Sequence, residues 1–245
     1  MLAQAHTSRL VLIDALRGCA IVLMVIYHLC FDLSYFGLAS FDFYRDPFWL
    51  NLRTLILSLF LGLVGVSLVL ASHSRLNVRR YLQRLILLVA SAVLVSLSSW
   101  WMFGERFVFF GVLHFITIAS VLGLLFVRAG WFNLIAGVGV ILFATQYQAA
   151  WFDTAGRRWI GLMTHKPLTE DYVPLLPWFG VVLLGLFVGP YIMQWSKTRL
   201  QGTTDAASIR WLALAGRHSL VIYLIHQPLL IGALSVYVKL VSQPV

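Results

Sequence analysis

Seven long apolar stretches follow one another along the sequence and limit what the chain can fold into. Each is rich in Leu, Ile, Val and Phe and lacks the alternation of a half-exposed strand. In a bilayer every backbone polar group must be paired inside the segment, and a helix of about 20 residues does this. The predicted spans cover residues 11–36, 50–72, 82–102, 107–128, 131–149, 174–195 and 214–240. We therefore predict an all-α integral membrane protein, a bundle of about seven transmembrane helices.

Composition supports this fold class. Of the 245 residues, 60% are hydrophobic and only 11% are charged, whereas a soluble domain has about 25% charged residues. The spans use nearly the whole length, so we expect one polytopic domain, 1–245, without a separate soluble part. The net charge of +9 comes mainly from arginines near the predicted helix ends. This is the distribution of a multi-pass membrane protein, and it does not indicate a nucleic-acid partner.

The orientation follows from the short loop between the second and third predicted spans. Arg75, Arg79, Arg80 and Arg84 are concentrated there. Lys and Arg in short loops favour the cytoplasmic side of a membrane. We therefore expect a cytoplasmic N-terminus, an extracytoplasmic C-terminus and an extracytoplasmic loop 150–173, which could contain a short interfacial helix.

The first predicted span carries three ionisable residues, Arg17, His28 and Asp32. Such groups each cost roughly 2.5–3.5 kcal/mol at the centre of a span, so they usually face the protein interior and serve a function. At about 100° per residue, His28 returns to within about 20° of the direction of Arg17. Asp32 lies one turn beyond His28 on the same side. The pattern predicts a polar stripe with a cation at its inner end and a His/Asp pair further along.

His28 with Asp32 is a candidate catalytic pair. A carboxylate beside an imidazole fixes its tautomer and stabilises the imidazolium, which suits a general base. Direct attack by an activated acceptor is simpler here than a covalent enzyme intermediate, because we find no suitable Ser or Cys nucleophile on the stripe. The alternative is that His28 makes only structural hydrogen bonds.

Arginines mark the inner ends of three predicted spans, namely Arg17, the pair Arg80 and Arg84, and Arg217. The guanidinium fork donates two parallel hydrogen bonds, which suits phosphate. These residues therefore suggest a phosphorylated donor that enters from the cytoplasm. The alternative is simple positive-inside anchoring.

Further candidate substrate contacts lie on later spans. His114 and His226 fall in the outer half of the membrane by their predicted depth, like His28, and Gln227 follows His226. Trp178 begins the sixth span, where it could line an acceptor pocket or serve as an interfacial anchor. We predict no metal site.

Taken together, these residues resemble the heparan-α-glucosaminide N-acetyltransferase catalytic-domain family, which belongs to a wider group of transmembrane acyltransferases. The resemblance extends from about residue 9 to about residue 240. The segments that carry it are Ile13–His28, Phe60–Leu68, Phe110–His114, Leu176–Gly180 and Gly216–Pro228. The first and last are the more specific, because they place charges inside spans in a fixed order.

The resemblance implies transfer of an acyl group from cytoplasmic acyl-CoA to a sugar or glycan across the membrane, and we expect acetyl-CoA to be the donor. It implies His28 as the catalytic histidine, and Arg17, Arg80 and Arg84 as contacts to the CoA phosphates. It suggests His114 and His226 as pocket residues. We expect a multi-pass protein of the inner (cytoplasmic) membrane, with acyl-CoA, an amino sugar or glycan acceptor and the bilayer as partners. A second copy of the chain is a further candidate partner.

Two other functions stay open at this point. One is a haem-binding electron carrier that uses the intramembrane histidines as ligands. The other is a non-catalytic membrane subunit that handles glycans or lipids.

Overall fold

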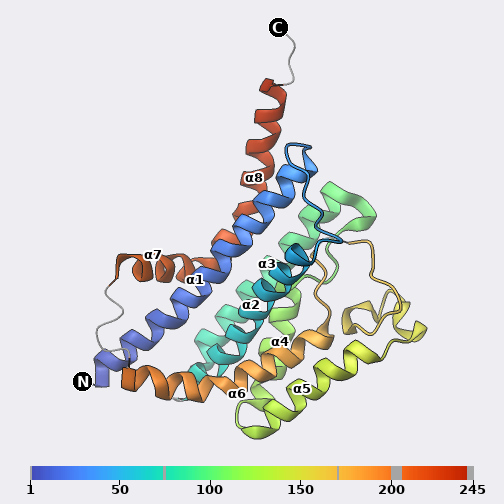
Figure 1. The fold of residues 1–245 in the computed structure, drawn as a ribbon. Coiled ribbons are helices and arrows are strands. Elements are labelled where there is room, and N and C mark those ends of the chain that lie inside the picture. The colour runs from blue at the N-terminus through green and yellow to red at the C-terminus, as the bar shows by residue number, and fades with distance from the viewer. Residues whose placement is uncertain (1, 74–75, 170, 200–205, 242–245) are drawn as a thin grey trace. The chain divides into compact units, whose positions relative to one another are not determined.

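The computed structural model describes residues 2–73, 76–169, 171–199 and 206–241, with the side chains of residues 2–10 and 196–199 left out. Arg75, part of the cluster that set the predicted orientation, lies outside the described residues. The described regular structure is helical, which confirms the predicted all-α fold (Figure 1). Its elements are α1 (Leu2–Tyr35), α2 (Pro47–His73), α3 (Val78–Phe103), η1 (Gly104–Arg106), α4 (Val112–Phe126), α5 (Trp131–Gln146), η2 (Ala150–Asp153), η3 (Arg158–Ile160), α6 (Leu175–Arg199), α7 (Ala207–Arg217) and α8 (Ser219–Val241).

Each predicted span corresponds to a helix, but the helices differ in length. Five, α1, α2, α3, α6 and α8, are long and apolar enough to cross a membrane. The other two, α4 and α5, have 15 and 16 residues, which is below the usual span of about 20. Glycines limit both, because Gly111 precedes α4 and Gly130, with φ of 56°, precedes α5.

The last predicted span starts later than expected. Residues 207–217 form a separate helix, α7, and α8 begins only at Ser219. His218 lies between them with φ −100° and ψ 15°, which is outside helical geometry. The α7 helix exposes Arg210 and Trp211 and buries Ala213, so it is amphipathic rather than the beginning of a span. The apolar residues 211–215 hid this boundary in the sequence.

Short polar side chains begin two of the long helices. The first backbone N–H groups of a helix have no partner inside it. Asp46 Oδ1 accepts from the backbone N–H of Phe48 at 2.9 Å, and Pro47 occupies the first position of α2, where proline is favoured. Asn77 Oδ1 accepts from the backbone N–H of Arg80 at 3.0 Å at the start of α3.

The chain forms two compact units. The first contains Met1–Phe60 and Ser196–Val245, and the second contains Leu61–Trp195. The first unit therefore combines the two ends of the sequence, with α1, the beginning of α2, α7 and α8. The second contains the remainder of α2, then α3 to α6.

In the first unit, α7 crosses the N-terminal half of α1, and α8 continues beside the C-terminal half (Figure 1). Two glycines permit the crossing. A Cβ added to Gly18 would lie 1.8 Å from the carbonyl oxygen of Leu212, and one added to Gly216 would lie 1.8 Å from that of Asp14. The backbones are therefore in direct contact, as in small-residue helix crossings within membranes.

An aromatic cluster packs against the middle of α1 in the same unit. The ring of Tyr27 lies edge-on to Phe43 at 5.2 Å and to Trp49 at 5.9 Å between centroids. Phe43 and Trp49 lie 4.3 Å apart. These offset and edge-to-face arrangements are the favoured ones for aromatic pairs. The cluster fixes the segment before α2 against the turn of α1 that carries His28.

Small residues also bring helices together in the second unit. A Cβ on Gly65 of α2 would lie 2.2 Å from the carbonyl oxygen of Val182 on α6. Likewise, a Cβ on Gly137 of α5 would lie 2.9 Å from the carbonyl oxygen of Gly180. The α6 helix thus packs closely on α2 through one face and on α5 through another.

Candidate functional site

Three charged side chains form an ion-pair cluster where α1 and α7 cross. Arg17 Nη1 lies 3.2 Å from Asp14 Oδ1, and Arg217 Nε lies 3.2 Å from Asp14 Oδ2. Two of the four arginines predicted to hold an anion are therefore brought together by a shared carboxylate. These three side chains bring two guanidinium groups to one carboxylate.

Asp14 is a site residue that the sequence interpretation did not name. The available signal was its position three residues before Arg17, a spacing that places both side chains on one helix face. The long-range partner, Arg217, could not be recognised from the sequence. Arg217 is the more exposed of the two arginines, with 57% of its side chain accessible against 22% for Arg17.

Further along α1, His28 faces His226 of α8. Their ring centroids lie 5.0 Å apart, and the ring planes make an angle of 62°. His226 Nδ1 lies 2.7 Å from the backbone carbonyl oxygen of Tyr223. The structure thus brings two of the three histidines singled out in the sequence into contact.

Asp32 is oriented by α8 rather than by His28. Asp32 is 3% exposed, and its Oδ1 accepts a hydrogen bond from Gln227 Nε2 at 3.4 Å. Among the described residues we find no hydrogen bond between Asp32 and His28. The His/Asp pair expected from the spacing therefore lies on one helix face, while the hydrogen bond that holds the carboxylate comes from Gln227.

The four residues leave polar atoms without protein partners. In the described part of the chain, five buried side-chain atoms have no hydrogen-bond partner. Four of them belong to this group, namely His28 Nδ1, Asp32 Oδ2, His226 Nε2 and Gln227 Oε1, and the fifth is Asn133 Oδ1 on α5. Buried polar groups are normally paired, so unpaired ones need an explanation. Four such atoms on two facing helices are the arrangement expected of a binding site for a polar ligand.

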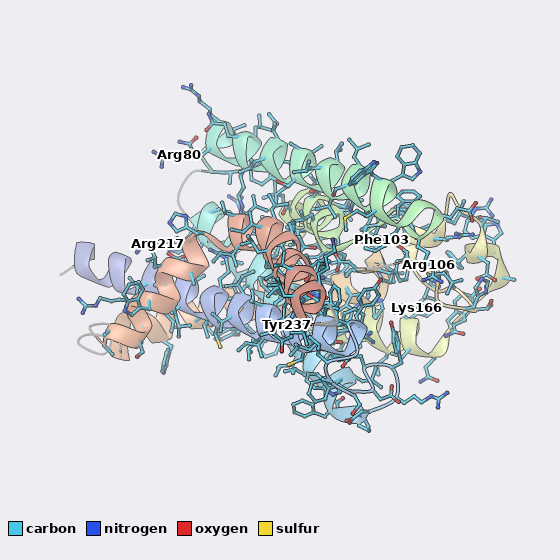
Figure 2. The ribbon with its side chains drawn as sticks, turned by 90° about the horizontal axis from the view of Figure 1, so that it is seen from above. Arg80, Phe103, Arg106, Lys166, Arg217 and Tyr237 are labelled. Carbon is cyan, nitrogen blue, oxygen red and sulfur yellow. The ribbon has the colours of Figure 1, made fainter. Side chains whose placement is uncertain are left out.

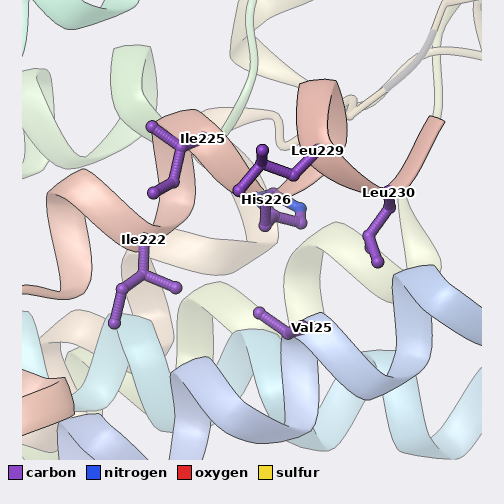
Figure 3. Close-up of a pocket in the computed structure, with 6 residues that line it drawn as sticks. All are labelled: Val25, Ile222, Ile225, His226, Leu229 and Leu230. Carbon is purple, nitrogen blue, oxygen red and sulfur yellow. The ribbon is translucent and has the colours of Figure 1, made fainter. Parts of the chain in front are cut away.

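An apolar pocket of about 220 Å³ lies beside this cluster, between α1 and α8 (Figure 3). Its walls contain one imidazole, that of His226, among aliphatic side chains. The lining residues are Val25, Ile222, Ile225, His226, Leu229 and Leu230. The ring of His226 therefore has hydrocarbon on one side and the imidazole of His28 nearby.

The second unit contains the other four predicted site residues. Arg80 and Arg84 lie in the first two turns of α3 and are both exposed. Arg80 lies at the opposite end of α3 from Phe103 (Figure 2). Between the two arginines, the Tyr81 hydroxyl donates to the backbone carbonyl of Ser120 on α4 at 3.1 Å. Trp178 is partly buried near the start of α6.

His114 uses both ring nitrogens inside the second unit. Its Nδ1 accepts from the backbone N–H of Gly111 at 3.2 Å, so Nε2 carries the proton of the neutral ring. Nε2 lies 3.1 Å from Ser96 Oγ, whose own proton goes to the carbonyl of Val108 at 2.6 Å. A contact between substrate and a ring nitrogen of His114 would require the loss of one of these bonds.

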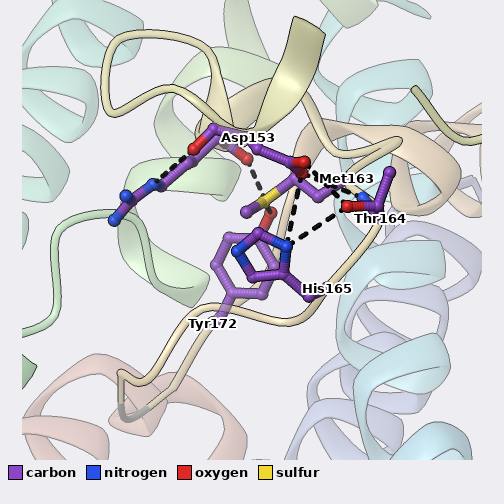
Figure 4. Close-up of polar contacts among 6 residues, drawn as sticks. Asp153, Met163, Thr164, His165 and Tyr172 are labelled. Carbon is purple, nitrogen blue, oxygen red and sulfur yellow. Dashed lines mark hydrogen bonds and ion pairs between the residues drawn. The ribbon is translucent and has the colours of Figure 1, made fainter. Parts of the chain in front are cut away.

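The loop between α5 and α6 is tied by its own polar contacts (Figure 4). Asp153 accepts from the Thr164 hydroxyl at 2.7 Å and from its backbone N–H at 3.0 Å, and His165 lies 3.8 Å away. These hydrogen bonds lower the pKa of Asp153. The Tyr172 hydroxyl donates to the carbonyl of Arg158 at 2.6 Å, and burial raises the pKa of Tyr172 to about 12.

The loop for which the sequence suggested a short interfacial helix contains two short 3₁₀ segments, η2 and η3. The loop is also fastened to the start of α4, because Asp171 Oδ2 accepts from the backbone N–H of Val112 at 3.2 Å. Across the parts of the chain that the structure describes, no group of three or more His, Cys, Asp or Glu side chains could hold a metal ion.

Long apolar helices with a buried polar cluster between two of them define an integral membrane protein with an internal polar site. The particular family follows from the sequence. Residues 9–228 match the family described as "Heparan-alpha-glucosaminide N-acetyltransferase, catalytic", and the chain belongs to this family. Membership identifies a membrane acyltransferase and confirms the expected resemblance. No curated protein and no solved structure matches the chain.

Proposed function

We propose that the protein transfers an acetyl group from cytoplasmic acetyl-CoA to an amino sugar or glycan on the extracytoplasmic side of the inner membrane. The observation that carries the proposal is the family match over residues 9–228. The buried cluster on α1 and α8 supplies groups suited to the reaction.

In the proposed mechanism, His28 is the general base and Asp32 supports it. His28 takes a proton from the acceptor, whose nitrogen or oxygen attacks the thioester carbonyl. Asp32, held by Gln227 at 3.4 Å, contributes negative charge close to the histidines and stabilises the imidazolium that forms. His226 and Gln227 contact the acceptor, and His114 and Trp178 remain candidate contacts on the grounds of the sequence alone.

The donor's phosphates would bind to arginine side chains. Arg17 and Arg217 already lie beside one carboxylate, that of Asp14. Phosphate oxygens accept charge-assisted hydrogen bonds from guanidinium groups of this kind. Arg80 and Arg84, four residues apart on α3, are the candidates from the second unit. With the cytoplasmic arginines as the donor side, transfer would run from the inside to the outside.

The experiment is acetyl transfer by the purified protein in detergent or liposomes, with isotopically labelled acetyl-CoA and amino-sugar acceptors. Label should appear in the acceptor, and CoA should raise the thermal unfolding temperature because a ligand of the folded state stabilises it. No transfer from any CoA thioester, together with no thermal shift at millimolar CoA, would exclude the proposal. A Soret band in the visible spectrum would instead favour the haem carrier, and CoA binding without transfer would favour a non-catalytic subunit.

A further inference from the structure

Most of the unpaired atoms between α1 and α8 can only accept a hydrogen bond. Asp32 Oδ2 is a carboxylate oxygen. Gln227 Oε1 is an amide oxygen, since Nε2 of the same side chain donates to Asp32. A ligand that fills this site must therefore bring its own protons.

Nε2 of His226 is also a hydrogen-bond acceptor, because of the tautomer that the ring adopts. A backbone carbonyl only accepts, so the 2.7 Å contact between His226 Nδ1 and the Tyr223 oxygen requires a proton on Nδ1. In the neutral ring, Nε2 then carries a lone pair. That atom is buried and has no hydrogen-bond partner among the residues the structure describes. In this tautomer, Nε2 of His226 can accept a proton and act as a base.

We propose that His226 is a second catalytic base of the acyl transfer and not only a substrate contact. The inference rests on the proposed function. His226 is 7% exposed, and its ring lies 5.0 Å from that of His28. The two rings are in edge-to-face contact, so an acceptor group bound beside the pair lies close to both. The aliphatic side chains beside His226 exclude water, which preserves the proton-transfer path.

Two bases fit the proton count of an amine acceptor. An ammonium group gives one proton to the first imidazole, and its nitrogen lone pair then attacks the thioester carbonyl carbon. As the new N–C bond forms, the C–S bond breaks and its electron pair leaves on the CoA sulfur. The nitrogen gives its second proton to the other imidazole, which passes it to the thiolate. The products are the amide, CoA thiol and one proton released to water.

The groups around His226 stabilise its protonated, imidazolium form. The Tyr223 carbonyl stays hydrogen-bonded to Nδ1 in both protonation states and stabilises the cation. The adjacent residue, Gln227, holds α8 in register with Asp32 on α1. The carboxylate that offsets the new charge is therefore anchored by the residue next to the base.

The test compares three variants of His226 with a matched histidine control. His226→Gln removes the base, and we expect acetyl transfer to fall by about 10²–10⁴-fold, the usual range for acid–base catalysis. His226→Asn puts an amide N–H near the position of Nδ1, keeps the bond to Tyr223 and also lacks the lone pair. It should be as inactive as His226→Gln. His165→Gln, at an exposed loop histidine, should retain wild-type activity.

Each variant is also measured for the CoA-induced thermal shift, which reports folding and donor binding. The shift should match that of wild type, and added imidazole should partly restore transfer by His226→Ala. His226→Gln within threefold of wild type would overturn the inference, as would an active His226→Asn, because the role would then be structural. Both results would leave the proposed function intact, since that function fails only if the wild-type protein transfers nothing from CoA thioesters.

Discussion

The Arg217 guanidinium of α7 forms an ion pair with the Asp14 carboxylate of α1, with 3.2 Å between Nε and Oδ2. Asp14 uses its other oxygen for Arg17, so one carboxylate offsets the repulsion between two cations. A guanidinium has five N–H donors, and one contact to Asp14 does not exhaust those of Arg217. Under the proposed function, a donor phosphate would bind to arginines that are already held close together.

Replacing Arg17 or Arg217 with Ala should weaken CoA binding. Charge-assisted hydrogen bonds contribute about 1.5–3 kcal/mol each, which corresponds to roughly 10–150-fold in affinity. The measurement is the CoA concentration that gives a half-maximal thermal shift. Arg84→Ala should show a similar loss if α3 contributes to the donor site.

Asp14→Asn serves as the complementary variant, because it removes the charge but keeps the size of the side chain. We expect it to disturb the placement of both arginines and to weaken CoA binding. If Arg17→Ala and Arg217→Ala both bind CoA as wild type does, the cluster is structural and the donor phosphates lie elsewhere.

His28→Ala should lower acetyl transfer by about 10²–10⁴-fold with CoA affinity nearly unchanged. Asp32→Asn should lose less, because the imidazole remains and only charge support is removed. Initial rates at saturating acetyl-CoA give both values. A rate for His28→Ala within threefold of wild type would remove His28 from the base role.

How far the sequence predicted these features depends on the range of the interactions involved. Apolar runs and helix periodicity are local, so the all-α membrane fold and the common face of Arg17, His28 and Asp32 were accessible. The break at His218 could not be predicted, because the segments on both sides of it contain apolar residues. The two helices are distinguished only by the packing of α7 on α1.

The candidate site shows the same limit. The position of Asp32 on α1 predicted that its carboxylate would orient the imidazole of His28. The hydrogen bond to Asp32 comes instead from Gln227, which is far away in the sequence. Long-range partners of this kind depend on which helices pack together, and periodicity contains no information on that. The same applies to His114, whose bonds to Ser96 and Gly111 are set by the meeting of α3 and α4.

Gly216→Ala should destabilise the crossing of α1 and α7. The added Cβ would meet the Asp14 carbonyl oxygen at 1.8 Å, so α7 must move and carry Arg217 away from Asp14. We expect a lower unfolding temperature and weaker CoA binding. The matched control is Gly232→Ala in α8, where nothing lies within 4 Å of the new Cβ, and where alanine is favoured over glycine by about 1 kcal/mol in a helix. Equal effects of the two changes would contradict the close-packing argument.

Acid should release the loop between α5 and α6. Hydrogen bonds from Thr164, with the charges of His165 and Arg158, lower the pKa of Asp153. A lowered folded pKa gives stability that is present above the unfolded value of about 3.9 and is lost as pH falls through the folded value. Hydrogen exchange at the Thr164 amide should therefore be slow, after correction for intrinsic rates, near neutral pH and fast in strong acid. In Asp153→Asn the protection should no longer change over this pH range, and an unchanged profile would argue against the contact.

The orientation can be tested by cysteine labelling in a background in which Cys19 and Cys30 are replaced by alanine. A membrane-impermeant maleimide added outside should label Thr154→Cys in the α5–α6 loop and should not label Asn77→Cys before α3. Labelling after the membrane is opened provides the control for accessibility at Asn77. The reverse pattern would invert the direction of acyl transfer.

The first unit joins Met1–Phe60 to Ser196–Val245, and this has a consequence for biosynthesis. The ribosome delivers α1 well before its partners α7 and α8. At about 5–20 residues per second, the charged side chains of α1 spend on the order of ten seconds or more in the membrane before Arg217 and Gln227 exist. Asp14, Arg17 and Asp32 must therefore be tolerated during insertion by water, lipid headgroups or the insertion machinery. The Asp14 cluster is completed by Arg217 of α7 and the Asp32 cluster by Gln227 of α8, so the two polar clusters form one directly after the other.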